Sequence, residues 1–351
     1  MTATAKEATW QALDDAWKNP ATPTLPLKGK KYVVMSDTHM GDGGGADDFA
    51  PNEQALQNAL SYYLSEGFEL ILLGDIEEFW QFDLRQIVER YERSVYSTYK
   101  KFGKERVHRV FGNHDSEWGG LPDPTRAGAG LHTSADEAIK LSDDGGKVRI
   151  LLIHGHQGSI DSDKYAWFSR FFVRIFGALE PLARVTGLYG TGAAPKSPIA
   201  QDFERTFYLW ARKERVMLIC GHSHRAMFAS KSYAETLLDD IAELEVKSGN
   251  KEARLGNRRK IKRLQSQFED EKKKGRIIDP LETESKAVVP CYFNSGCGLY
   301  SDGLTCIEIA NDEILLIKWS NFTSDPGETP LRTVYDEEML NKLMDKVLTR
   351  P

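Results

Sequence analysis

Five short clusters of polar side chains carry the groups in this sequence that are best suited to binding metal ions. Each cluster directly follows an apolar run, which predicts a strand that ends where the polar groups begin. The residue types are aspartate, asparagine and histidine, and imidazole and carboxylate together suit Mn, Fe, Zn or a similar divalent ion. The clusters are Asp37 with His39, Asp75, Asn113 with His114, His154, and His222 with His224.

Histidine is distributed unevenly along the chain. Of the eight histidines, six lie in these clusters or beside them: His39, His114, His154, His156, His222 and His224. A single histidine is often a satisfied surface or core residue. That interpretation is poor for six histidines that all follow strands, so we expect the clusters to form one site.

The candidate ligands are too many for one ion. Seven ligands suit two ions that share one carboxylate. Two ions about 3.5–4 Å apart activate a bridging water as hydroxide and hold phosphoryl oxygens during in-line displacement. His114, next to the candidate ligand Asn113, would then protonate the leaving oxygen.

The spacing of the clusters predicts the elements that position them. The intervals from Asp37 to Asp75 and from Asp75 to Asn113 are both 38 residues, which is long enough for a strand–helix–strand unit. The carboxyl ends of parallel strands lie along one edge of a sheet. We predict strands at 31–35, 69–73, 107–111, 147–153, 216–220, 288–293, 304–309 and 314–319, and helices at 52–66, 84–102, 198–214 and 336–348.

Composition limits the class of protein. The 351 residues carry a formal net charge of −6, whereas general nucleic-acid binders usually carry a basic excess. No apolar run reaches the roughly 18 residues of a membrane span, and the amino terminus lacks the apolar core of a secretory signal. Cys220, Cys291, Cys297 and Cys306 lack CxxC spacing, so we expect buried, reduced thiols in a cytoplasmic protein. Peripheral contact with a membrane stays open.

Three segments fall outside this framework. Residues 1–30 predict an N-terminal arm that packs on a single domain formed by residues 31–351. Residues 161–214 begin with an aromatic-rich stretch and predict a helical cap, with core helices as an equal alternative. Residues 234–277 are rich in Lys, Arg and Glu and predict a projecting charged helical hairpin. A solvated surface is favoured over nucleic-acid contact for its basic end.

The motifs in order resemble the complete set of the calcineurin-like metallophosphoesterases. They are Asp37-x-His39, Gly74-Asp75, Gly112-Asn113-His114-Asp115, His154-Gly155-His156 and Gly221-His222-x-His224. The match runs from about 31 to 225 and, through Asn294-Ser295-Gly296, to about 320. The resemblance implies an α/β fold, a two-sheet β-sandwich flanked by helices, with a dinuclear metal centre.

The resemblance also implies a role for each residue. One metal would be held by Asp37, His39, Asp75 and His224, and the other by Asp75, Asn113, His154 and His222, with Asp75 bridging. His114 would be the acid, oriented by Asp115, and Gly112 and Gly221 would permit tight turns. Manganese is the first expectation for the two divalent ions, with Fe or Zn as alternatives.

Part of the sequence is similar to one subgroup, the UDP-2,3-diacylglucosamine pyrophosphohydrolases. The similarity lies in Gly74-Asp-Ile-Glu-Glu-Phe-Trp80, in residues 163–170 and in Gly-His-Ser-His-Arg225. Those enzymes typically carry arginine where this chain has His114, and the hairpin is foreign to them. The expected substrate is a nucleotide- or lipid-linked phosphoester, and the expected substrate contacts are Trp80, His156, Arg170 and Arg225. A core-facing position is an equal alternative for His156.

Two other functions remain as alternatives. One is a nuclease-type phosphodiesterase of the same superfamily. The other is a non-catalytic scaffold that keeps the fold and binds a partner through the hairpin.

Overall fold

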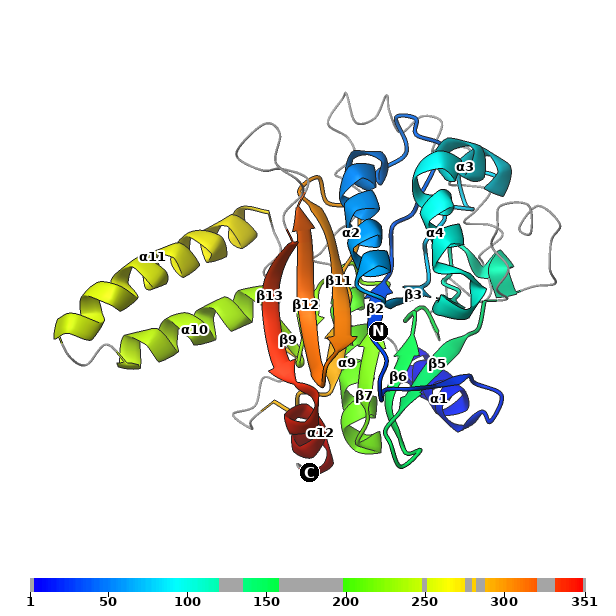
Figure 1. The fold of residues 1–351 in the computed structure, drawn as a ribbon. Helices are drawn as coiled ribbons and strands as arrows, with labels where there is room; N and C mark the ends of the chain where they lie inside the picture. Colours follow the sequence, from blue (N-terminus) through cyan, green and yellow to red (C-terminus); the bar gives the residue numbers. More distant parts are fainter. Residues whose placement is uncertain are drawn as a thin grey trace.

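Two mixed β-sheets stacked face to face form the centre of the fold (Figure 1). The computed structural model describes residues 3–119, 135–157, 198–247, 251–274, 280–281, 288–320 and 332–349. The six-stranded sheet has the order β13-β12-β11-β2-β3-β4, and the seven-stranded sheet has the order β1-β5-β6-β7-β10-β8-β9. The fold is therefore the expected α/β sandwich of two sheets flanked by helices.

The bounds of the strands are as follows. The six-stranded sheet contains β2 (Tyr32–Met35), β3 (Glu69–Leu73), β4 (Val107–Val110), β11 (Gly303–Ala310), β12 (Glu313–Ser320) and β13 (Arg332–Met339). The seven-stranded sheet contains β1 (Thr24–Pro26), β5 (Ala138–Ser142), β6 (Val148–Ile153), β7 (Met217–Cys220), β8 (Met227–Phe228), β9 (Lys231–Ser232) and β10 (Tyr292–Asn294).

The strands at the centre of the six-stranded sheet are apolar on both faces. Tyr32 and Val34 of β2 pack in the core that includes residues of the other sheet. Val33 and Met35 pack in a second core with helix α2 (Glu53–Ser65). Because successive side chains of a strand point to opposite faces, a strand covered on both sides is a continuous apolar run.

Parallel pairing brings the ends of the strands together. In the six-stranded sheet, β3 pairs in parallel with both β2 and β4. In the other sheet, β7 pairs in parallel with both β6 and β10. Helix α2 connects β2 to β3, and α3 (Leu84–Tyr91) and α4 (Ser97–Phe102) connect β3 to β4. A π-helical turn, Glu92–Tyr96, divides the helix that the sequence predicted as continuous.

The N-terminal segment is integrated into the sandwich. Helix α1 (Ala3–Lys18) packs against α9 (Pro198–Glu214), where the ring of Trp17 lies 6.3 Å from that of Trp210. Strand β1 adds to the seven-stranded sheet by pairing in parallel with β5. The expected arm therefore includes an edge strand of the sheet.

Helix α9 corrects part of the expected cap at 161–214. Phe207, Tyr208 and Trp210 are buried in the core beside the seven-stranded sheet, so residues 198–214 form a core helix, as the alternative interpretation had it. The aromatic-rich stretch at 161–190 lies outside the described residues.

The charged hairpin and the carboxyl terminus complete the fold. Helices α10 (Tyr233–Lys247) and α11 (Lys251–Lys273) contact each other and project from the body (Figure 1). The terminal helix predicted at 336–348 begins instead at Leu340, as α12 (Leu340–Thr349), because residues 332–339 pair with β12. All four cysteines are buried and free, as expected. Within the described ranges, no helix is long and apolar enough to cross a membrane.

Candidate metal centre

The candidate ligands gather where strands of both sheets end. Asp37 and His39 follow β2, Asp75 follows β3, and Asn113 follows β4. His154 follows β6, and the pair His222 and His224 follows β7. The two layers of the sandwich therefore supply ligands to a single site, although the sequence separates the first from the last by almost 190 residues.

Three overlapping groups of side chains have potential ligand atoms that all lie within 4.8 Å of one another. Asp75 belongs to two of them, and so does His39. The groups are Asp37 with His39 and His224, His39 with Asp75 and His114, and Asp75 with His154 and His222.

Individual distances show how closely the groups approach. Asp75 Oδ2 lies 3.1 Å from Nε2 of His154 and 3.7 Å from Nε2 of His39. The rings of His154 and His222 are 5.3 Å apart. Asp37 Oδ1 lies 3.2 Å from Nε2 of His224. The histidines of distant motifs thus converge, as the sequence analysis required.

Five of the seven candidate ligands have a left-handed backbone. The φ angle is 53° at Asp37, 47° at His39, 52° at Asp75, 65° at His222 and 58° at His224. This region is sparsely populated by residues other than glycine, although Asp and His are enriched there. Backbone strain of this kind concentrates at functional sites, where the surrounding structure enforces it.

Hydrogen bonds from the outer side fix which ring nitrogen faces the centre. Nδ1 of His154 lies 2.8 Å from the carbonyl oxygen of Leu73, and Nδ1 of His39 lies 2.9 Å from Oε2 of Glu78. These oxygens only accept, so each Nδ1 is the donor and each Nε2 presents a lone pair to the site unless the ring is protonated. Nε2 of His39 also lies 3.2 Å from Nε2 of His224.

This donor set fits divalent cations. The Nε2 atoms of His39, His154 and His224 face carboxylate oxygens or one another, and a contact between two lone pairs is favourable only with a proton or a cation between them. Asn113 Oδ1 is buried, and the described residues offer it no hydrogen-bond partner. An amide oxygen, imidazoles and carboxylates are the ligand types that suit a divalent transition metal.

Burial and neighbouring charges shift the pKa values of the histidines and carboxylates in the site. Burial alone would lower the pKa of His154, but the carboxylates of Asp75 and Asp37 raise it to about 10. Burial alone would raise the pKa of Asp75, but His154 and His114 hold it well below its usual range. Burial, with His154 nearby, lowers the pKa of His222 to about 3.

Glu78, and not Asp115, orients His114. The Nδ1 atom of His114 lies 2.8 Å from Oε1 of Glu78, and its ring stacks on Trp80 with the centroids 3.9 Å apart. The indole of Trp80 donates to the carbonyl oxygen of Asn113 at 3.0 Å. One face of the Trp80 ring, an expected substrate contact, therefore packs against the expected acid.

Asp115 organises the backbone instead. Its two carboxylate oxygens accept the amide hydrogens of Gly112 at 2.6 Å and Ile76 at 2.9 Å. This side chain is fully buried, and burial together with Asp75 raises its pKa to about 7. It joins the loop after β4 to the loop after β3, which holds Asp75 against Asn113.

Close packing, and not turn geometry, explains why positions 112 and 221 are occupied by glycine. Neither has a positive φ. A Cβ atom on Gly112 would collide with the carboxylate and amide of Asp75, and one on Gly221 would collide with Asp37 and Ser36. Gly74 and Gly155, which adjoin Asp75 and His154, have φ angles of +83° and +113°, in the region that favours glycine.

The end of β10 and the residue after it hold the backbone and side chains of the site in place. Ser295 Oγ lies 2.7 Å from Ser36 Oγ, which hydrogen-bonds the carboxylate of Asp37. Asn294 donates to the carbonyl oxygen of Gly221 at 2.7 Å. The sequence marked 294–296 only as a continuation of the motif set. Glu78 was absent from the expected site residues, although it lies one turn after Asp75.

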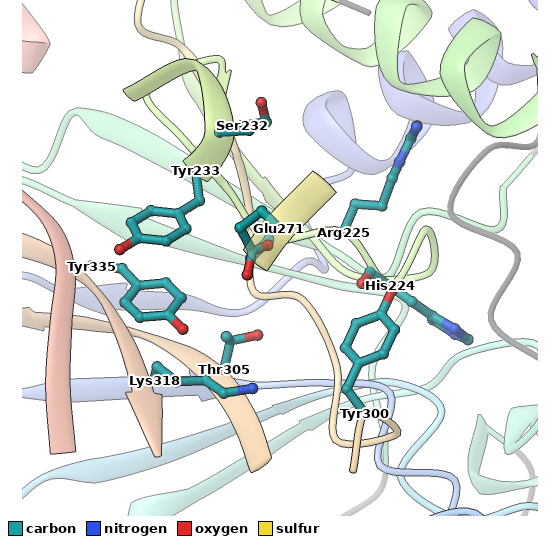
Figure 2. A pocket seen from close by; sticks show the side chains of 11 residues that line it. His224, Arg225, Ser232, Tyr233, Glu271, Tyr300, Thr305, Lys318 and Tyr335 are labelled. Carbon is teal, nitrogen blue, oxygen red and sulfur yellow. Dashed lines mark hydrogen bonds between the residues drawn. The ribbon is translucent and has the colours of Figure 1, made fainter. Parts of the chain in front are cut away.

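The structure describes two of the remaining expected substrate contacts, Arg225 and His156, and both are buried. Arg225 is buried in an ion pair with Glu204 of α9, and Figure 2 shows its guanidinium directed away from Tyr300 and Lys318. His156 is buried beside Phe111, with the rings 6.0 Å apart. Arg170 lies outside the described residues. The cavity in Figure 2, of about 50 Å³, lies beside His224 at the root of the hairpin.

A comparison with family models matches the part of the chain that holds the candidate ligands. A family model described as calcineurin-like phosphoesterase matches residues 30–226, which include every candidate ligand. A similar solved structure is that of a conserved uncharacterized protein, a predicted phosphoesterase, from Streptococcus pneumoniae. It has 12% identity and a TM-score of 0.28, with coverage of 87% of this chain and 97% of that chain. Among curated proteins, none matches.

Proposed function

Because the chain belongs to the calcineurin-like phosphoesterase family, we propose that it hydrolyses phosphoesters at a centre of two divalent cations. The observation that carries this proposal is the position of Asp75. Its carboxylate lies within 4.8 Å of potential ligand atoms in two different groups, which is the position that a carboxylate shared by two cations needs.

The proposed ligand sets follow the two sides of Asp75. Asp37, His39 and His224 would complete one set, and Asn113, His154 and His222 would complete the other. Two such cations supply an activated water and offset the negative charge of a phosphoryl group during displacement. Mn is the first candidate, and Fe and Zn share the same ligand preferences.

His114 is the proposed general acid. Burial alone would lower its pKa, but the carboxylates of Glu78 and Asp75 raise it to about 9. Cations bound at the site would bring that pKa down toward neutrality. His114 would therefore carry a proton for the leaving oxygen at neutral pH, held in place by Glu78 on its edge and Trp80 on its face.

The proposed substrate class is a phosphodiester or diphosphate with a nucleotide or lipid-linked group, of which UDP-2,3-diacylglucosamine is one example. The segment from Glu78 to Trp80, which carries part of the resemblance to enzymes of that substrate, surrounds His114. His114 itself favours ordinary phosphoester cleavage, because the resembling subgroup typically has arginine there. A panel of monoesters, diesters and nucleotide sugars on Mn-loaded protein ranks these substrates directly.

The decisive test joins metal analysis to turnover. We expect Mn-loaded protein to hydrolyse bis-p-nitrophenyl phosphate and His114→Gln to lower kcat by about 10²–10⁴-fold, the usual contribution of a general acid, while metal content is retained. His108→Gln is the matched control, because His108 lies in β4 and pairs with Glu69 at 2.9 Å, outside the site. Protein that binds no metal and has no turnover would favour the scaffold alternative.

The nuclease alternative has one observation in its favour. Five exposed basic residues lie on α11, namely Arg258, Arg259, Lys260, Lys262 and Arg263. Cleavage of single-stranded DNA whose rate falls steeply with salt would support a nuclease. Turnover of small diesters without DNA cleavage would exclude it.

A further inference from the structure

The hairpin is held to the body at its root. The rings of Tyr233, which begins α10, and Tyr335 of β13 stack in parallel with centroids 4.0 Å apart. The Thr236 hydroxyl donates to Asp336 at 3.0 Å, and Lys274 lies 2.8 Å from Asp302. Figure 2 shows the two tyrosines facing each other beside Lys318. These contacts therefore fix the direction in which the hairpin leaves the body.

The two helices of the hairpin pack through one narrow apolar seam. Leu237 is buried, and Ile241 and Leu244 of α10 are half-buried, as are Ile261 and Leu264 of α11. These residues recur at intervals of three and four, so each helix uses a single face for its partner. Among the residues of both helices whose burial the structure describes, most side chains outside this seam are exposed.

Charge is segregated between the two helices. Helix α10 contains five acidic residues and one basic residue. Residues 251–263 of α11 contain seven basic residues and one acidic residue. The hairpin thus presents an acidic helix beside a basic one, and this pattern is complementary to itself after a two-fold rotation.

An exposed apolar stripe accompanies the acidic helix. Leu238 is 48% exposed and Val246 is 83% exposed, and Ala242 between them is also exposed. Their spacing of four residues places them along one side of α10. Large exposed apolar side chains aligned on a charged helix are a common feature of protein-binding surfaces.

We propose that α10 and α11 form a self-association surface on which a second copy of this chain docks through its own hairpin. In a two-fold antiparallel arrangement, the acidic α10 of each copy lies on the basic half of α11 of the other. The apolar stripe of α10 is covered in the same contact. The interface is isologous, so a single set of residues supplies both of its sides.

A polyanion fits this surface less well than a second copy does. Packed helices lie about 8–10 Å apart, and the Debye length is about 8–10 Å near physiological salt. A nucleic acid or an anionic membrane that approaches the cations of α11 therefore also meets the carboxylates of α10. The overall net charge of −6 adds to that repulsion.

Charge reversal on each helix tests the proposal with the full-length protein. One variant combines Asp240→Lys with Glu245→Lys on α10, and the other combines Arg258→Glu with Lys262→Glu on α11. All four positions are exposed, and none belongs to the metal centre. Sedimentation equilibrium measures self-association, and circular dichroism with thermal unfolding checks that each variant folds.

The expected result is a dimer of the natural chain that weakens at least about tenfold between 0.1 and 1 M salt, as the Debye length falls from about 10 to 3 Å. Each reversed variant is expected to be monomeric alone. A mixture of the two is expected to form a heterodimer, because the reversed charges on α10 of one variant then face the reversed charges on α11 of the other, and the second α10–α11 pair keeps its natural charges. Leu238→Ser with Val246→Ser is expected to weaken the natural dimer without changing its salt dependence.

Two results would overturn the proposal. One is a monomeric natural chain at the highest soluble concentration in low salt. The other is a dimer that both charge-reversed variants retain, which would place the contact elsewhere. A monomer that binds single-stranded DNA or phosphatidylserine vesicles, and loses that binding in the α11 variant, would assign the surface to a polyanion. Because turnover is not measured, failure here leaves the proposed hydrolase function unaffected.

Discussion

Glu78 holds His114 through a hydrogen bond of 2.8 Å between Oε1 and the ring Nδ1. The other oxygen, Oε2, lies 2.7 Å from the same Nδ1 and 2.9 Å from Nδ1 of His39. One buried side chain therefore orients both the proposed acid and a proposed metal ligand. Burial would raise the pKa of Glu78, but the two histidines lower it to about 2, so it remains a charged acceptor for both rings.

Glu78→Gln is expected to weaken metal binding and catalysis together. An amide has no negative charge and only one accepting oxygen where the carboxylate has two, so it holds the two ring Nδ1–H groups more weakly. Loss of such an outer hydrogen bond typically costs about 10–100-fold in metal affinity or activity. Manganese titration and kcat on bis-p-nitrophenyl phosphate measure the two effects.

The neighbouring residue Glu77 supplies the matched comparison. It forms a buried ion pair with Arg109 at 2.7 Å. Glu77→Gln leaves Arg109 buried without its counter-charge, which costs about 3–5 kcal/mol of stability, but it should lower manganese affinity much less than Glu78→Gln does. Natural manganese affinity and natural kcat in Glu78→Gln would contradict the orienting role.

Asp75→Asn is expected to remove both metals. Its carboxylate is buried between His154 and His39 and also accepts the amide hydrogen of His114 at 2.8 Å. Replacing the shared charge by a neutral amide takes a ligand from each proposed set. Metal content measured by mass spectrometry should fall to near zero, with loss of nearly all turnover. Asp143→Asn, in the turn between β5 and β6, is the control, and a fully loaded, active Asp75→Asn protein would rule out the shared position.

Gly112→Ala is expected to disrupt the site by contact alone. The added Cβ would collide with the side chain and backbone of Asp75, so Asp75 must move from its position beside His154. Manganese affinity should fall together with thermal stability. Gly145→Ala is the control, since its Cβ would meet only a side-chain oxygen of Asp143, 3.4 Å away. Equal manganese affinity in the two alanine variants would show that the approach of Gly112 to Asp75 is not needed.

The sequence was informative wherever local pattern and position coincide. Apolar runs ended by glycine or by a cluster of polar residues marked β2, β3, β4, β6 and β7, and the ends of these strands hold all seven candidate ligands. Equal spacing of Asp37, Asp75 and Asn113 corresponds to parallel strands separated by helices. Because these strands pair in parallel, their polar ends lie at the same edge of the sheet, and the sequence alone was enough to predict this.

The expectations that failed depended on distant partners. Residues 332–339 carry charged residues with a helix-like composition, but pairing with β12 makes them an edge strand, where charges are tolerated. Arg225 follows a metal-ligand motif and therefore suggested anion binding. Its partner Glu204 lies 21 residues earlier, on a helix whose position the sequence could not fix. For the same reason, the sequence did not indicate that His114 pairs with Glu78 rather than with Asp115.

Arg225→Met is expected to reduce stability without changing substrate affinity. It leaves Glu204 buried and charged, at a cost of about 3–5 kcal/mol. Adding Glu204→Leu removes that charge and should recover most of the loss. Denaturant unfolding measures stability, and KM for bis-p-nitrophenyl phosphate reports substrate contact. A raised KM in both variants, with natural stability in the single one, would return Arg225 to a substrate-binding role.

Asp336→Asn is expected to stabilise the protein at neutral pH but much less in acid. Burial raises the pKa of Asp336 to about 6 from an ordinary value of 3.8, despite the hydrogen bond from the Thr236 hydroxyl. The folded state therefore keeps this proton more tightly than the unfolded state, so the stability linked to the group is complete below about pH 4 and is lost as pH rises through 6. Asparagine is neutral throughout and keeps an accepting oxygen for Thr236.

The melting temperature of the variant should exceed that of the natural chain at pH 8, with the difference shrinking by pH 5. Glu337→Gln, at the exposed neighbouring position, is the control, and a difference in melting temperature that is the same at both pH values would mean that ionisation of Asp336 is not its cause.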